Sequence, residues 1–144
     1  MAIHTTLPIY GAATDLLLRV TAAVDNMPRN AKPVLGTLLV KNCLRITDLI
    51  RDANIAEDKG RDLEKLLRRL SRVETLLRVG VELAHVKRPA YGDAIKLTQS
   101  IGRQASGWRK SSSTSPVARP PRQPDPSDSQ SGRAARPQGD RHAR

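Results

Sequence analysis

The chain has 144 residues, 38% of them apolar, and no uninterrupted apolar run reaches the about 18 residues that a membrane-spanning helix needs. It holds no Phe, one Trp and two Tyr, so its core must use Leu, Val, Ile and Ala, which favours packed helices and disfavours an all-β fold. Its 25 basic and 14 acidic residues give a net charge of +11, which favours an anionic partner: nucleic acid, an acidic protein or an anionic membrane.

The single cysteine and the N-terminal residues bear on the compartment. Cys43 stands alone, which excludes an intrachain disulfide and a cysteine-rich metal site. The first residues lack the basic start and the long apolar core of a secretory signal. We therefore expect a protein of the reducing cytoplasm that does not enter a membrane.

The first two segments of the chain space their apolar residues by three and four, as on one face of an α-helix. Between Pro8 and Pro28 these positions are Tyr10, Ala13, Leu17, Val20, Val24 and Met27. After Pro33, which suits a helix start, they are Leu35, Leu38, Leu39, Asn42, Ile46, Leu49, Ile50 and Ala53. We expect the Asn42 amide to pair across the bundle and fix its register, with a functional contact as the alternative, and Cys43 to be a packed thiol.

The next two segments repeat the pattern. After the connector at residues 54–60 the apolar positions are Leu63, Leu66, Leu67, Leu70, Val73, Leu77, Val81 and Ala84. After Pro89 and Gly92 they are Ala94, Leu97, Thr98, Ile101, Ala105 and Trp108. Four amphipathic helices with short connections predict an all-α fold, an antiparallel up-down-up-down four-helix bundle.

The composition changes after Lys110. Residues 111–144 begin with serines and a threonine, hold six of the ten prolines and contain one large aliphatic residue, Val117. Such a segment cannot bury enough apolar surface to offset the entropy of ordering it. We therefore expect a four-helix bundle domain over residues 1–110 and a disordered, basic Pro/Ser-rich tail over residues 111–144, whose role stays open.

Four cations of the third helix form what we call the basic ridge. At 100° per residue they fall on one line nearly opposite the apolar positions; they are Arg61, Lys65, Arg68 and Arg72. Charged helix faces are commonly only solvated, and Asp62 and Glu64 are near enough in sequence to pair with the ridge. The surplus of cations elsewhere favours binding of nucleic acid or a polymerase, by the ridge together with Arg103, Arg109 and Lys110. Because aromatic residues are scarce, we expect contacts to the phosphate backbone rather than stacking on bases.

The same line of the third helix becomes apolar toward its C-terminal end, at Leu76, Val79 and Leu83. These side chains cannot all face the core if Leu77 and Val81 occupy it. Contiguous exposed apolar side chains usually mark contact with another chain. We therefore predict a homo-oligomer joined partly through these residues; the alternative is a broad apolar face on a helix central to the bundle.

No sequence pattern of an enzyme stands out. Glu82 and His85 form a Glu-x-x-His pair one helical turn apart, as in di-iron carboxylate bundles, but such centres need a second pair and two further carboxylates. We expect His85 to be an edge residue of the core. Phosphate-binding loops, nucleophile elbows and zinc spacings are missing from the sequence, so we predict no catalytic residue, no metal and no cofactor.

Several short motifs point to one family. They are Met27-Pro28-Arg29-Asn30 after the first helix, Lys41-Asn42-Cys43-Leu44 in the second, Ala53-Asn54 at the connector, and Gly102, Gly107 and Trp108 running into basic residues. Together with the long Leu/Arg third helix, residues 7–110 resemble the accessory variability determinant family, the small four-helix-bundle proteins of diversity-generating retroelements. The Pro-rich tail has no counterpart in that pattern.

This resemblance implies a homopentameric, barrel-like assembly with a strongly basic surface that binds the retroelement's reverse transcriptase and associates with its template RNA. Such a protein would hold polymerase and RNA together during mutagenic copying into complementary DNA, without catalysis of its own. The family's basic character falls here on Arg68, Arg72, Arg103, Arg109 and Lys110. The sequence leaves open which basic face meets the polymerase and whether nucleic acid is bound directly.

The alternative function keeps the fold and changes the role. Similar four-helix bundles are encoded in intervening sequences of ribosomal RNA genes, where general nucleic-acid or protein binding is the expected activity. The genomic neighbourhood separates the two: a reverse transcriptase gene with paired template and variable repeats favours the retroelement function, and a ribosomal operon favours the other.

Overall fold

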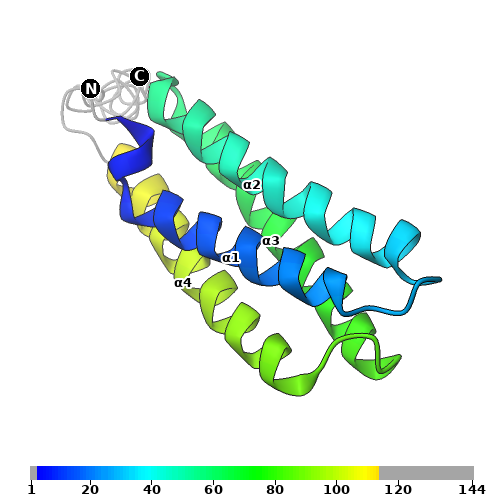
Figure 1. Cartoon of the computed structure of the whole chain (residues 1–144). Helices are drawn as coiled ribbons and strands as arrows, with labels where there is room; N and C mark the ends of the chain where they lie inside the picture. The colour runs from blue at the N-terminus through cyan, green and yellow to red at the C-terminus, as the bar shows by residue number, and fades with distance from the viewer. Residues whose placement is uncertain (1–2, 114–144) are drawn as a thin grey trace, which may run out of the picture. The chain divides into compact units, whose positions relative to one another are not determined.

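The computed structural model describes residues 3–113, which form a bundle of four α-helices (Figure 1). The long helices are α1 (Pro8–Asp25), α2 (Thr37–Ile55), α3 (Lys59–Glu82) and α4 (Arg88–Ser113). A 3-10 turn, η1 (His4–Thr6), precedes α1, and a π-helical turn, η2 (Lys32–Gly36), leads into α2. α4 continues past Lys110, so residues 111–113 of the predicted tail are helical, and the rest of that tail lies outside the described residues.

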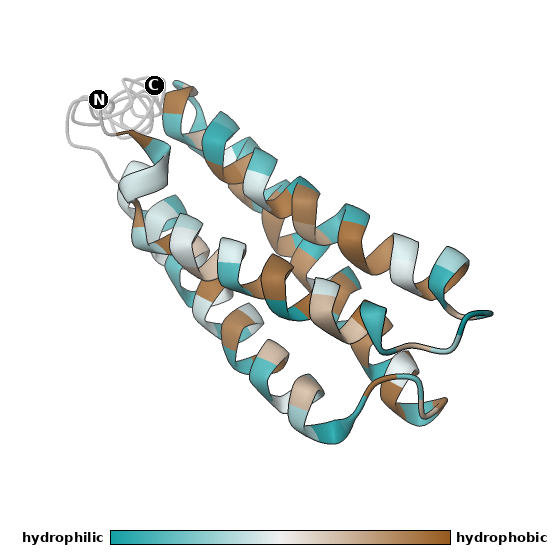
Figure 2. Cartoon of the chain, viewed as in Figure 1, coloured by the Kyte–Doolittle hydropathy of each residue, from teal (hydrophilic) through white to brown (hydrophobic). Residues whose placement is uncertain are grey.

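The helices are arranged up-down-up-down, as predicted. The α1–α2 and α3–α4 connections lie at one end of the bundle and the α2–α3 connection at the other (Figure 1). Each helix packs against its neighbours in the ring α1–α2–α3–α4–α1. Hydropathy follows this arrangement, because brown, apolar segments gather where the helices face one another (Figure 2). The all-α four-helix bundle is therefore confirmed.

The core is built almost entirely from aliphatic side chains, but it does not use every predicted position. Side chains buried from α2 and α3 include Leu39, Ile46, Leu49, Ile50, Leu63, Leu66, Val73 and Leu77. In α1 the core positions are Ile9, Ala13, Leu16 and Val20, so the predicted Ala13 and Val20 are confirmed, while the predicted Tyr10 and Leu17 are half-buried at the edge of the core. The prediction was wrong for Leu38 and Ala84, which are exposed. Leu38 faces outward because Leu39 and Asn42 already occupy the inner face of α2.

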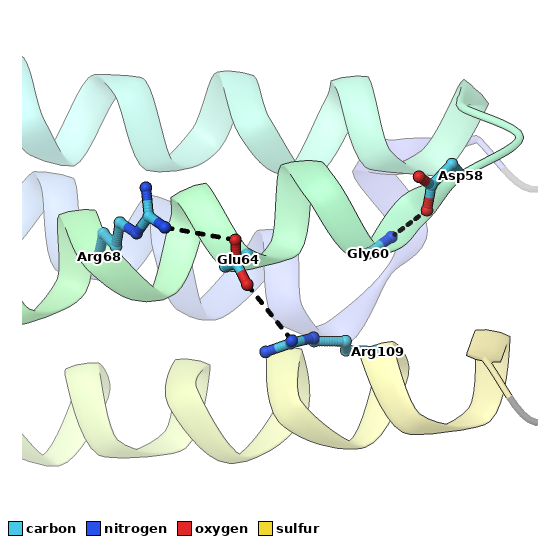
Figure 3. A network of polar contacts seen from close by, with 5 residues as sticks. All are labelled: Asp58, Gly60, Glu64, Arg68 and Arg109. Atoms are coloured by element: carbon cyan, nitrogen blue, oxygen red, sulfur yellow. Dashed lines mark hydrogen bonds and ion pairs between the residues drawn. The ribbon is translucent and has the colours of Figure 1, made fainter.

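Charged side chains close the turn between α2 and α3. Lys59 Nζ donates hydrogen bonds to the carbonyl oxygens of Ala53, Asn54 and Ala56 at 3.0, 3.2 and 2.9 Å. Asp58 precedes α3, and its carboxylate accepts from the Gly60 N–H at 3.2 Å (Figure 3). Carbonyl oxygens at the end of one helix and an N–H at the start of the next are thereby satisfied. This turn fixes where α3, the helix that carries the basic ridge, begins.

At the opposite end, α3 stops in a left-handed turn. Ala84 has a φ of 60°, its N–H donates to Val81 O, and the His85 N–H donates to Gly80 O at 2.7 Å. This is the Schellman pattern of hydrogen bonds, with alanine in the position where glycine is usual because a Cβ crowds the backbone there. The buried Val86 side chain then packs on Gly80, where an added Cβ would meet its Cγ2 at 2.6 Å.

Candidate nucleic-acid interface

A hollow between α2 and α3 is lined mainly by cationic side chains; we call it the α2–α3 groove. It has a volume of about 350 Å³. Its lining is Arg45 and Leu49 from α2 with Lys65, Arg68, Arg69 and Arg72 from α3. Five of these six side chains are cationic and none is acidic. Basic groups crowded around low-dielectric walls focus their field into the hollow, so an anion is the favoured occupant.

The groove contains three of the four residues of the basic ridge. Lys65, Arg68 and Arg72 line it, while Arg61 is exposed on α3 outside the lining. Arg45 and Arg69 were not among the predicted site residues, because the periodicity of a single helix does not show which side chains of another helix lie beside it. A signal for them was present: Arg45 lies one helical turn from Asn42, the polar position for which a partner on another helix was expected.

Asn42 holds one of the groove's arginines in place. The residue is 3% exposed, its Nδ2 donates to Leu38 O at 2.8 Å, and its Oδ1 accepts from Arg69 Nη1 at 3.0 Å. The predicted pairing of the Asn42 amide across the bundle is therefore confirmed, with α3 as the partner helix. The amide nitrogen of Asn42 is bonded within α2, which orients its oxygen toward Arg69. The Arg69 guanidinium is therefore held at the groove before any ligand binds.

Glu64 joins two of the predicted binding residues. Its Oε1 accepts from Arg68 at 3.3 Å along α3, and its Oε2 accepts from Arg109 of α4 at 3.4 Å. Figure 3 shows both guanidinium groups directed at this one carboxylate. All three side chains are well exposed, so the pairs are screened by water and contribute little to stability. Their effect is to lower the net charge that Arg68 and Arg109 offer to a ligand.

The remaining predicted cations, Arg103 and Lys110, lie in a second hollow, the α3–α4 groove, of about 630 Å³. Glu74 lines the same groove, and its Oε2 accepts a 2.7 Å hydrogen bond from the buried Thr98 hydroxyl. Small residues line it from both helices, Ser71 from α3 and Gly102, Ser106 and Gly107 from α4. A fixed carboxylate among the cations makes this groove mixed in charge rather than purely basic.

The residues predicted to join subunits lie at the end of α3 that is far from the α2–α3 turn. Val79 and Leu83 are 42% and 57% exposed, whereas Leu76 is half-buried against the core. In η2 and at the start of α2, Val34 and Leu38 are 66% and 45% exposed. Leu35 lies within 3.5 Å of where a Gly80 Cβ would sit, so these ends of α2 and α3 are adjacent. We call Val34, Leu38, Val79 and Leu83 the apolar end.

The Glu82 and His85 pair does not have the predicted geometry. α3 ends at Glu82, and the left-handed Ala84 turns the chain away, so His85 lies in the α3–α4 connection instead of one helical turn along α3. His85 is partly buried, as expected of an edge residue. Within residues 3–113 no three His, Cys, Asp or Glu side chains gather as metal ligands would.

Cys43 is fully buried in the core next to Asn42. Burial raises the pKa of its thiol to about 12, because the thiolate would lose its hydration there. The reactive thiolate is therefore suppressed at neutral pH, and the prediction of a packed thiol is confirmed.

Among the helices of residues 3–113, none combines the length and the apolar character that crossing a membrane would take. Comparison of the chain with family models and with curated proteins gave no match. The two grooves and the apolar end are therefore the structural features from which binding and self-association can be inferred.

Proposed function

We propose that this protein is a non-catalytic nucleic-acid-binding scaffold, an accessory protein of a diversity-generating retroelement that brings reverse transcriptase and template RNA together in the cytoplasm. The observation that carries the binding function is the α2–α3 groove, with five cations and no carboxylate in its lining. The retroelement role rests on the motif resemblance at residues 27–30, 41–44, 53–54 and 102–108.

The scaffold works through phosphate contacts. Lys and Arg that neutralise phosphates release condensed counterions, so each contact adds affinity and steepens its dependence on salt. The ridge continues the groove along α3 to Arg61, which gives an RNA strand a path of cations longer than the groove itself. Bound together, polymerase and template meet at a high effective concentration, and copying is assisted without any chemistry by the bundle.

The apolar end supports the proposed homo-oligomer, for which the resemblance implies five subunits. Four large aliphatic side chains are exposed there. Burying them between copies removes apolar surface from water at about 25 cal/mol per Å². It also repeats the cationic groove in every subunit, which multiplies the phosphate contacts available to one RNA.

The binding function is tested by replacing Arg61, Lys65, Arg68 and Arg72 with alanine. We expect RNA affinity, measured by fluorescence anisotropy at low salt, to fall at least 100-fold, with unchanged helicity by circular dichroism. A control with alanine at Arg29, Lys32, Lys87 and Lys96, four exposed cations outside both grooves, removes the same charge. Equal losses of RNA affinity in the two variants would show that only net charge matters and would contradict binding at the basic ridge.

The partner and the assembly need separate measurements. A pull-down of a diversity-generating retroelement reverse transcriptase by the full chain should succeed without RNA and gain from added template RNA. Sedimentation at micromolar concentration should give a single oligomer that Leu83→Asp, together with Val79→Asp, dissociates. A stable monomer of the unaltered chain would contradict the proposed oligomer. Failure to retain the polymerase would contradict the retroelement role.

A further inference from the structure

The α2–α3 groove concentrates more positive charge than a single phosphodiester can neutralise. A nucleic-acid strand brings one charge per phosphate, and its phosphates are separated by sugars. Five cations surround one hollow of about 350 Å³, a size within the range of pockets for small ligands. We propose that this groove is a binding site for a triphosphate group, the chemistry shared by a free nucleoside triphosphate and the 5′ end of an unprocessed RNA.

The ion pairs around the groove compensate only part of its charge. Within residues 3–113, Lys65, Arg69 and Arg72 make no ion pair. Arg45 approaches Asp52 only to 4.0 Å, and Arg68 shares Glu64 with Arg109. Neither carboxylate belongs to the lining. Mutual repulsion among the cations is therefore relieved best by a ligand that carries several charges in one compact group.

The donor set matches the shape of linked phosphates. Four of the five cations are arginines, whose planar guanidinium groups bind phosphate oxygens through two parallel hydrogen bonds. They come from two helices, so their donors reach a ligand from both walls. Three successive phosphates present oxygens to both walls at once, which one phosphodiester does not.

Preorganisation favours a defined site over a diffuse patch. Arg69 is anchored by the buried Asn42 at 3.0 Å, and the fully buried Leu49 lies beneath the groove as part of the packed core. An arginine already held in place loses less side-chain entropy when it binds a ligand. The anchored Arg69 and the packed core beneath it give the hollow a fixed base, above which the exposed Lys65, Arg68 and Arg72 can close around the ligand.

The first experiment does not depend on RNA. The full chain is titrated by calorimetry with inorganic triphosphate and, at matched ionic strength, with orthophosphate. We expect one triphosphate per chain, bound at least 10-fold more tightly than orthophosphate. Arg45→Ala combined with Arg72→Ala should weaken triphosphate at least 10-fold, while Lys87→Ala with Lys96→Ala, which removes equal charge, should leave it unchanged. Equal affinity for the two anions, or equal losses in the two variants, would overturn the site.

The second experiment distinguishes the sources and rests on the proposed RNA binding. One RNA sequence is compared with a 5′-triphosphate and with a 5′-hydroxyl, alongside a free nucleoside triphosphate. A 10-fold preference for the triphosphorylated RNA, lost in the Arg45→Ala/Arg72→Ala variant, assigns the groove to RNA ends. Tight binding of the free nucleotide without that preference supports the site and assigns it to nucleotides. If RNA does not bind but triphosphate does, the proposed function fails and this site stands.

Discussion

The two grooves that flank α3 use the same cationic residue types and differ in what surrounds them. In the α2–α3 groove five cations line the wall without a carboxylate, and a buried amide fixes one of them. In the α3–α4 groove Arg103 and Lys110 share the lining with Glu74, which the Thr98 hydroxyl holds in place. A count of basic residues therefore does not locate an anion site, since neighbouring carboxylates decide how much charge is left for a ligand.

The largest expected effect compares the two grooves directly. Alanine at Arg45, Lys65 and Arg72 should lower RNA affinity about 100-fold at low salt and reduce the slope of log affinity against log salt by about 2, because about three single-strand phosphate contacts are lost. Alanine at Arg103 and Lys110 of the α3–α4 groove, together with Arg109 on α4 outside its lining, removes equal charge and should cost less than about 5-fold. Anisotropy titrations over a salt series give both numbers, and the reverse order of effects would reject the comparison.

The buried amide that distinguishes the α2–α3 groove is tested by Asn42→Leu. The change removes the acceptor for Arg69 and forces an apolar side chain into a polar position, so we expect about 2 kcal/mol less stability in urea unfolding. Asn26→Leu is the matched control, since the Asn26 side chain is exposed and donates to Ala22 O on its own helix; its effect should stay within about 0.5 kcal/mol. Similar losses at the two positions would show that the buried amide has no special role.

A change remote from both grooves separates stability from binding. Ala84→Gly relieves the left-handed strain at the end of α3 and should stabilise the bundle by about 1 kcal/mol, with RNA affinity unaltered. Thermal and urea unfolding measure the gain, and Ala90→Gly, within α4, is the control that should lose a similar amount. A loss at Ala84 would mean that the left-handed conformation carries no strain.

The smallest expected effect concerns the carboxylate of the α3–α4 groove. Glu74→Gln removes one negative charge beside Arg103 and Lys110 and should raise RNA affinity about 3-fold. Glu82→Gln makes the same charge change at the exposed end of α3 and should raise RNA affinity by a smaller factor. If the two variants behave alike in anisotropy titrations, Glu74 does not balance the charge of that groove.

The sequence predicted the helices well because apolar spacing is local. It predicted the phase of α1 less well: Leu16, Leu17 and Leu18 are consecutive, and only contact with α2 and α4 decides that Leu16 is buried. The end of α3 was missed for a related reason. Glycine is the usual signal for a left-handed turn, and here alanine adopts it, so the helical spacing of Glu82 and His85 suggested a pair that does not form.

The candidate site was predicted in part. The basic ridge on α3 follows from one helix alone, and three of its residues line the α2–α3 groove. Arg45 and Arg69 become binding candidates only when α2 and α3 lie side by side with Asn42 between them. The pairing of Arg109 with Glu64 also joins residues 45 positions apart, which spacing along one helix cannot show.

The buried position of the single cysteine makes its labelling rate a measure of how often the bundle opens. Cys43 is sealed beside the amide that anchors the α2–α3 groove, so an alkylating reagent reaches it only when α2 separates from its neighbours. The labelling rate at neutral pH then reports how often the bundle opens. A polyanion that holds the two groove walls together should slow that labelling, which links occupancy of the surface to opening of the core through a cysteine that the chain already contains.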